Sequence, residues 1–181
     1  DPLDGTQEYS EFDRADWAVH IALWERKDAD GKPSDEGSIT QAAVALPAYN
    51  MTLSTHQLPK TPDKHEGKPR LVVSRNRATR EAVIVAEALD CDVARLGSAG
   101  AKTMAVVLGE VDIYVHAGGM YQWDSAAPIA VAAAAGLFTS RIDGTPLIYN
   151  RRDAWLPDLV VCQQHLAQQV IDALRAGRLG A

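Results

Sequence analysis

The sequence predicts a mixed fold, both α/β and α+β, in which an antiparallel sheet is followed by a mostly parallel sheet with flanking helices. Three observations support this prediction. Apolar side chains alternate with period two within residues 19–55, as is typical of strands. Residues 58–69 are rich in proline and charged side chains. From residue 71 onward, strand-like and helix-like patterns follow each other in turn, which indicates an α/β layer.

Three strands are expected before the proline-rich stretch, around residues 19–23, 39–46 and 51–55. The polar segment Asp28–Lys32 is interpreted as the turn of a hairpin. It is not a calcium loop, because its glycine comes too early and Ile39 occupies the position of the closing acid. Strands joined by short turns predict an antiparallel sheet.

The stretch 58–69 offers little side chain to bury, since it holds three prolines, five charged residues and one histidine. We therefore predict a linker or mobile loop. It divides the chain into residues 1–68, the remainder of an N-terminal α+β domain, and residues 69–181, a C-terminal α/β domain.

The second part begins with a short buried strand at 71–73. An i, i+3, i+4, i+7 apolar stripe then predicts a helix over 82–89. The same reasoning predicts the remaining elements: a strand at 92–96, a helix at 100–108, a strand at 111–115, an alanine-rich helix at 125–135, a strand at 159–162, and a closing helix over 166–174.

Composition limits the classes of partner. The net charge of −6 over 181 residues argues against a nucleic-acid polymer, since phosphate backbones require clustered Lys and Arg. No apolar run has the length of a membrane span and no signal-peptide pattern is present. Cys91 and Cys162 are predicted to be reduced core residues of a cytoplasmic protein. A local basic group at positions 70, 75, 77 and 80 suits a small anionic ligand.

The opening DPLDGT places Asp1 and Asp4 three residues apart, with Pro2 and Gly5 to bend the chain. Asp-Pro and Asp-Gly are common in ordinary turns. The alternative is that the two carboxylates converge on a cation, because close carboxylates do not both stay ionised cheaply without one. Oxygen-only ligation of this kind favours Mg²⁺.

A second acid, Asp124, precedes a predicted helix in WDSAAP. It is well placed as an N-cap residue. It also follows a strand and Gly118-Gly119, so it is expected at a carboxyl edge of the sheet, where α/β proteins bind ligands. His116, at the end of the same strand, is a weaker candidate for that pocket.

The third stretch, GSAGAKT at 97–103, superficially resembles a phosphate-binding P-loop, but its spacing fails because Ala101 precedes the lysine. Two interpretations stay open. Ser98 and Lys102 face an anion at a strand-to-helix turn, or Lys102 is a solvated side chain on a helix flank.

DPLDGT, GSAGAK and WDSAAP, in this order, resemble the inositol monophosphatase-like superfamily of metal-dependent phosphatases. VVSRN at 72–76, VDIYVHAGG at 111–119 and LPDLVVC at 156–162 are similar to the CysQ-type 3′(2′),5′-bisphosphate nucleotidases. The resemblance covers essentially the whole chain. It implies a layered sugar-phosphatase fold.

The resemblance also implies roles for individual residues. Asp1 and Asp4 are metal ligands and, with Thr6, catalytic residues; Asp1 bridges two ions, and Asp124 is the third carboxylate. The main-chain carbonyl of Leu3 is a further ligand, and Thr6 orients the attacking water. The residues implied to contact substrate are Gly5, Thr6, Ser74, Arg75, Ser98, Lys102 and Asp124.

The implied activity is Mg²⁺-dependent removal of the 3′-phosphate of adenosine 3′,5′-bisphosphate, with 3′-phosphoadenosine 5′-phosphosulfate as a second substrate. The basic group at 70–80 favours a substrate with two phosphates. Two alternatives stay open: an inositol monophosphatase or broad sugar-phosphate phosphatase, and a fragment that binds anions or a partner chain without turnover.

Two departures from the family pattern concern the site. Gln7 stands where the family usually has lysine, which removes one positive charge near the phosphate. Family members also carry an N-terminal segment before DPLDGT with further acids. We therefore expect this chain to be a fragment, paired with a second chain that bears the missing part; a homo-oligomer is also open.

Overall fold

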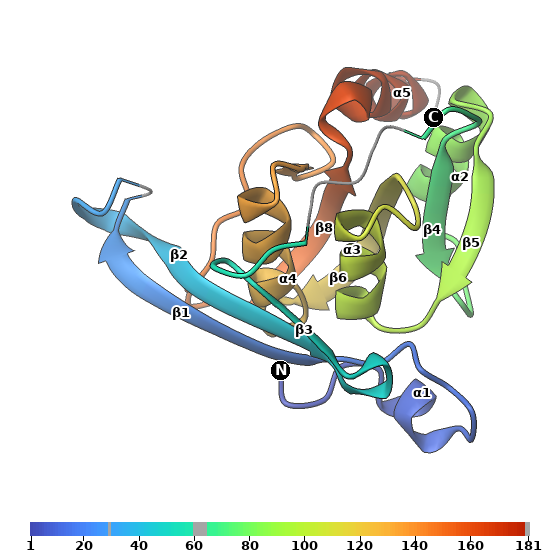
Figure 1. Ribbon diagram of the computed structural model, residues 1–181. Coiled ribbons are helices and arrows are strands. Elements are labelled where there is room, and N and C mark those ends of the chain that lie inside the picture. The colour runs from blue at the N-terminus through green and yellow to red at the C-terminus, as the bar shows by residue number, and fades with distance from the viewer. Residues whose placement is uncertain (29, 60–64, 180–181) are drawn as a thin grey trace.

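A computed structural model describes residues 1–28, 30–59 and 65–179. The chain forms four layers: an antiparallel sheet, a pair of helices, a mixed sheet and a second pair of helices (Figure 1). The predicted layered fold is confirmed. The predicted linker at 58–69 falls partly on residues 60–64, outside the described residues, and its described flanks contain no helix or strand.

The antiparallel sheet has the order β1-β2-β3 and comprises β1 (Val19–Lys27), β2 (Pro33–Leu46) and β3 (Met51–Ser54). The Asp28 amide donates to the Lys32 carbonyl, as expected of a hairpin turn. β2 begins six residues before the predicted start, because its polar N-terminal part pairs with the far end of β1 through the backbone. Backbone pairing of this kind leaves no apolar periodicity to detect.

The second sheet has the order β5-β4-β6-β8-β7. β4 lies parallel to β5 and β6, whereas β8 is antiparallel to β6 and β7, so four of the five strands run in one direction. The bounds are β4 (Arg70–Ser74), β5 (Asp92–Leu96), β6 (Ile113–Tyr121), β7 (Phe138–Ser140) and β8 (Trp155–Cys162). β7 was not predicted, because three residues are too few for a periodic pattern.

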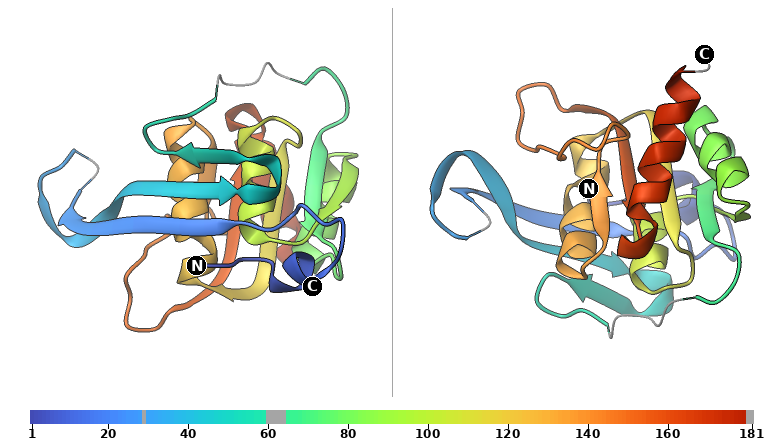
Figure 2. Two further views of the ribbon diagram at one scale, coloured as in Figure 1. Left: turned by 60° about the horizontal axis from the view of Figure 1, so that its bottom comes forward. Right: turned by 90° about the horizontal axis from the view of Figure 1, so that it is seen from above.

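Helices cover both faces of this mixed sheet. α3 (Ala99–Val107) and α4 (Gln122–Ala134) lie between the two sheets, while α2 (Arg80–Ala88) and α5 (Ala167–Leu179) lie side by side on the outer face (Figure 2). One apolar cluster joins Val44 of the first sheet to Met104, Val131 and Tyr114, so the two sheets share a core around α3 and α4. A second cluster lies beneath α2 and α5. In the part of the chain that the structure describes, no helix is long and apolar enough to cross a membrane.

The start of α4 corrects one prediction. The helix begins at Gln122, so Asp124 is its third residue and not its N-cap. The Asp124 carboxylate still closes the helix start, because it accepts a hydrogen bond of 2.7 Å from the amide of Tyr121. Pro128 lies inside the helix.

Candidate metal centre

The opening segment is held along the start of β1. Asp4 exchanges two backbone hydrogen bonds of 2.9 Å with Ala18, and the His20 amide donates to the carbonyl of Asp1 at 2.8 Å. Gly5 then turns the chain with φ of 84°, a conformation that favours glycine, into the short helix α1 (Thr6–Ser10). These contacts fix both carboxylates relative to the first sheet.

Asp124 reaches the same place from α4. The ligand oxygens of Asp1, Asp4 and Asp124 lie within 4.8 Å of one another, and all three residues are half-buried. Acids separated by 120 positions thus meet where the first sheet faces the N-terminal turn of α4.

Each of the three carboxylates has one oxygen held by protein donors, and within residues 1–28, 30–59 and 65–179 no hydrogen bond from the protein reaches the other oxygen. The donors are the Leu3 amide to Asp1 Oδ1 at 2.9 Å, the Gly100 amide at 2.7 Å and the Ser98 hydroxyl to Asp4 Oδ2, and the Tyr121 amide to Asp124 Oδ2 at 2.7 Å. This arrangement orients three oxygens before any ion arrives.

Electrostatics also fit a cation. Burial raises the pKa of Asp124, and the neighbouring charge of Asp4 raises it further. A divalent ion offsets both effects, since it stabilises the ionised forms. The oxygen-only donor set is that of a hard ion such as Mg²⁺. Leu3 lies between the two opening acids, and the role of its carbonyl as a ligand stays a prediction.

His20 lies beside Asp4 and was not among the residues that the sequence predicted for the site. Its ring is buried; Nε2 lies 3.4 Å from Asp4 Oδ2, and Nδ1 lies 3.3 Å from the Trp123 carbonyl oxygen. Burial lowers the pKa of His20, and the Asp4 charge opposes this effect. The available signal was its place in the alternation of β1, which directs it to the same face as Ala22 and Trp24.

Ser98 and Lys102 are buried at the start of α3, and Ser98 contacts the acid cluster directly. The Ser98 hydroxyl donates to Asp4, and its oxygen caps α3 by accepting from the Ala101 amide. Lys102 is 3% exposed; its Nζ donates to the Gly97 carbonyl and lies 5.3 Å from the Tyr114 ring centroid. Lys102 is therefore neither solvated nor on an open wall, and its contact with substrate stays a prediction.

Ser74, the last residue of β4, and Arg75, the next residue, have different surroundings. The Arg75 guanidinium is bound by both carboxylate oxygens of Glu11 and lies near Glu8. Its charge is thus already matched within the protein. Ser74, by contrast, lines a cavity of about 470 Å³ together with Arg77, Arg80 and His116.

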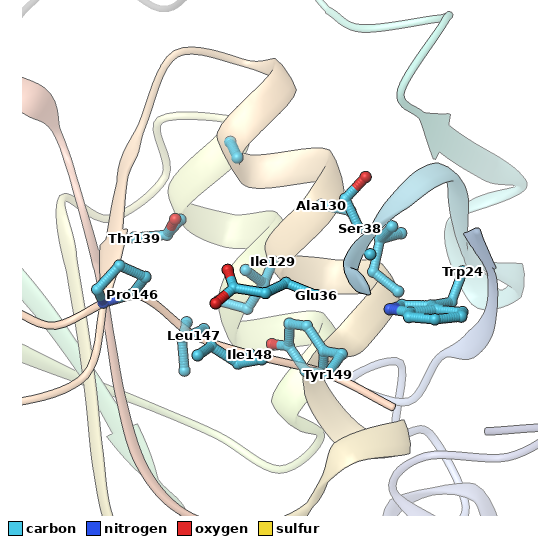
Figure 3. A pocket seen from close by; sticks show the side chains of 13 residues that line it. Trp24, Glu36, Ser38, Ile129, Ala130, Thr139, Pro146, Leu147, Ile148 and Tyr149 are labelled. Carbon is cyan, nitrogen blue, oxygen red and sulfur yellow. The ribbon is translucent and has the colours of Figure 1, made fainter. Parts of the chain in front are cut away.

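Thr6 is exposed at the start of α1, next to Gly5 and the acids, and its predicted role in orienting water stays a prediction. A different cavity of about 400 Å³ lies between the β1–β2 hairpin, α4 and the segment 146–149 (Figure 3). None of the predicted site residues lines it.

The model of the inositol monophosphatase family matches residues 1–178. The chain belongs to this family. Among curated relatives, the 3′-phosphoadenosine 5′-phosphate phosphatase of Mycobacterium tuberculosis is 46% identical over 177 residues, covering 96% of this chain and 64% of the relative. The 3′(2′),5′-bisphosphate nucleotidase CysQ of Escherichia coli is 30% identical over 86% of this chain and 63% of its own length. This member of the inositol monophosphatase family therefore spans less than two thirds of those relatives.

Solved structures support the fold of this family member. The inositol monophosphatase of Thermotoga maritima has a TM-score of 0.73 at 16% identity, over 99% of this chain and 68% of that chain. The inositol monophosphatase from Anabaena has a TM-score of 0.71 at 22% identity, over 97% of this chain and 70% of that chain.

Proposed function

We propose that this chain carries the metal centre of an Mg²⁺-dependent phosphomonoesterase that hydrolyses the 3′-phosphate of adenosine 3′,5′-bisphosphate to AMP and phosphate. 3′-Phosphoadenosine 5′-phosphosulfate is the second proposed substrate. The observation that carries the proposal is the meeting of Asp1, Asp4 and Asp124, each with one oxygen held by a protein donor. The names of the mycobacterial relatives supply the substrate.

The chemistry of the reaction suits these residues. Phosphate-ester hydrolysis depends mainly on positioning and on spreading charge. Divalent cations, when bound, neutralise the phosphate and activate the attacking water. The contribution of this chain is to orient the acid oxygens and, through Gly5 and Thr6, to place the phosphate and the water beside them.

The second phosphate needs a counter-charge, and the structure distinguishes members of the basic group. Arg70 is bound by Asp112 and Arg75 by Glu11, so both are already paired. Arg77 and Arg80, in contrast, line the cavity that also contains Ser74 and His116. We assign the second phosphate to this cavity, because it offers positive charge and hydrogen-bond donors.

The test compares two substrates with and without Mg²⁺. We expect phosphate release from adenosine 3′,5′-bisphosphate, abolished by a chelator, at a kcat/KM well above that for inositol 1-phosphate. The Arg77→Ala variant should raise KM for the bisphosphate by about tenfold, as expected for loss of one charged hydrogen bond. Arg26→Ala, on the exposed part of β1, is the control.

Two alternatives give different results in the same experiment. A preference for inositol 1-phosphate supports an inositol monophosphatase or broad sugar-phosphate phosphatase. Metal binding without phosphate release from any substrate supports a module that binds anions or a partner chain.

A further inference from the structure

A buried histidine connects two of the acids. His20 is 4% exposed, and its side chain lies between Asp4 of the opening segment and the backbone just before Asp124. Both neighbours, the Asp4 carboxylate and the Trp123 carbonyl, are acceptors; a neutral imidazole, with one N–H, can donate to one of them, and an imidazolium can donate to both. Nε2 has no hydrogen-bond partner within the described part of the chain, although Asp4 Oδ2 is only 3.4 Å away.

The surrounding backbone leaves room for this ring. A Cβ on Gly100 would overlap His20 Nε2 and would lie 3.1 Å from the Cβ of Ala18. The amide of the same glycine donates to Asp4 Oδ2. Gly100 thus binds Asp4 through its amide, and its lack of a side chain leaves space for the His20 ring. The three residues therefore pack against one another.

We infer that His20 is a positioning residue that fixes the distance between Asp4 and Asp124 by contacting the Asp4 carboxylate with Nε2 and the Trp123 carbonyl with Nδ1. The backbone of Trp123 continues directly into Asp124, so holding the carbonyl holds the first turn of α4. Without the ring, Asp4 and Asp124 remain on separate elements, one beside β1 and the other on α4.

The inference uses the metal centre of the proposed function but not its substrate. Cation binding, and not turnover, is therefore the measurement that tests it. Outer-shell partners of metal ligands typically change metal affinity by about 10-fold to 100-fold when removed.

The experiment measures Mn²⁺ affinity by electron paramagnetic resonance in the full protein, without substrate. His20→Leu keeps an apolar side chain of similar size but loses both polar contacts, and we expect its Kd for Mn²⁺ to rise about tenfold or more. His20→Gln retains a donor at the Nε2 position and His20→Asn one at the Nδ1 position. Each should recover part of the lost affinity.

Val44→Ala is the matched control, because Val44 is fully buried and pairs with His20 across β1 and β2. It should lower the melting temperature and leave Mn²⁺ affinity unchanged. The inference is overturned if folded His20→Leu binds Mn²⁺ like the wild type, if neither amide recovers affinity, or if Val44→Ala weakens Mn²⁺ binding equally. Failure of the substrate assignment would leave these Mn²⁺ results unchanged.

Discussion

The amide of Gly100 donates a hydrogen bond of 2.7 Å to Oδ2 of Asp4, across 96 positions of the chain. This bond joins the N-terminal turn of α3 to the acid pair at the start of the chain. The same oxygen of Asp4 also accepts a hydrogen bond from the Ser98 hydroxyl. The two halves of the chain therefore meet at the candidate metal centre.

Gly100→Ala should harm both stability and metal binding. The new methyl group would overlap the His20 ring, and overpacking of this kind costs about 1–3 kcal/mol. Urea denaturation should show the loss of stability, and Mn²⁺ titration a weaker affinity. A Gly100→Ala protein of unchanged affinity would contradict the packing described here.

Asp124→Asn tests the third acid. The amide oxygen of asparagine still accepts from the Tyr121 amide, so α4 should begin at the same residue and the melting temperature should change little. The substitution removes the negative charge of a proposed metal ligand. Substitutions of outer-shell partners cost up to about 100-fold, and we expect the rate of phosphate release to fall by at least that much here. Activity within a factor of about ten of the wild type would show that Asp124 is not a ligand.

Asp112→Asn should lower stability at neutral pH. Burial raises the pKa of Asp112, but hydrogen bonds from Arg70 more than offset this, so the net pKa is lowered. A lowered carboxyl pKa stabilises the folded state above the pKa of the unfolded chain, and this stabilisation disappears as the pH falls through the folded pKa. The variant should lose about 2 kcal/mol at pH 7.

Measuring the free energy of unfolding of both proteins at low pH tests whether the charge of Asp112 causes the loss. The difference in unfolding free energy between wild type and Asp112→Asn should shrink below pH 4 and vanish at lower pH. A difference that is independent of pH would show that shape, and not charge, accounts for the loss.

The regular elements were predictable because their packing repeats along the chain. β5 was predicted at its observed bounds, since a strand between two helices in an α/β layer is flanked by clear changes of period. β7 and the polar start of β2 were not, because they are held by backbone pairing whose partners lie far away in the sequence.

The residues of the candidate site also differ in whether the sequence alone could predict their roles. Asp1, Asp4 and Asp124 stand in recognisable motifs, so their residue types suggested their chemistry. The burial of Lys102 and the pairing of Arg75 with Glu11 depend on how α3 and α1 pack, and no local pattern reports that. His20 was invisible for a related reason: its partners are an acid 16 residues earlier and a carbonyl 103 residues later.

Lys102→Met should stabilise the protein near neutral pH. Burial lowers the pKa of Lys102 to about 8, against the raising effect of nearby Asp4. The folded lysine thus loses its proton at a lower pH than the unfolded one. Between pH 8 and about 10.5 the unfolded chain binds more protons, so wild-type stability should rise with pH in that window. Methionine removes the buried charge and should remove this slope.

Urea denaturation at pH 7.5 and pH 9.5 checks the effect of Lys102→Met. We expect the variant to be the more stable protein at pH 7.5 and the gap to narrow at pH 9.5, because only the lysine gains stability by losing its proton. Arg26→Met, an exposed change on β1, controls for replacing a cation by methionine. If Lys102→Met is less stable at both pH values, the hydrogen bond from Nζ to the Gly97 carbonyl outweighs the cost of burying the charge.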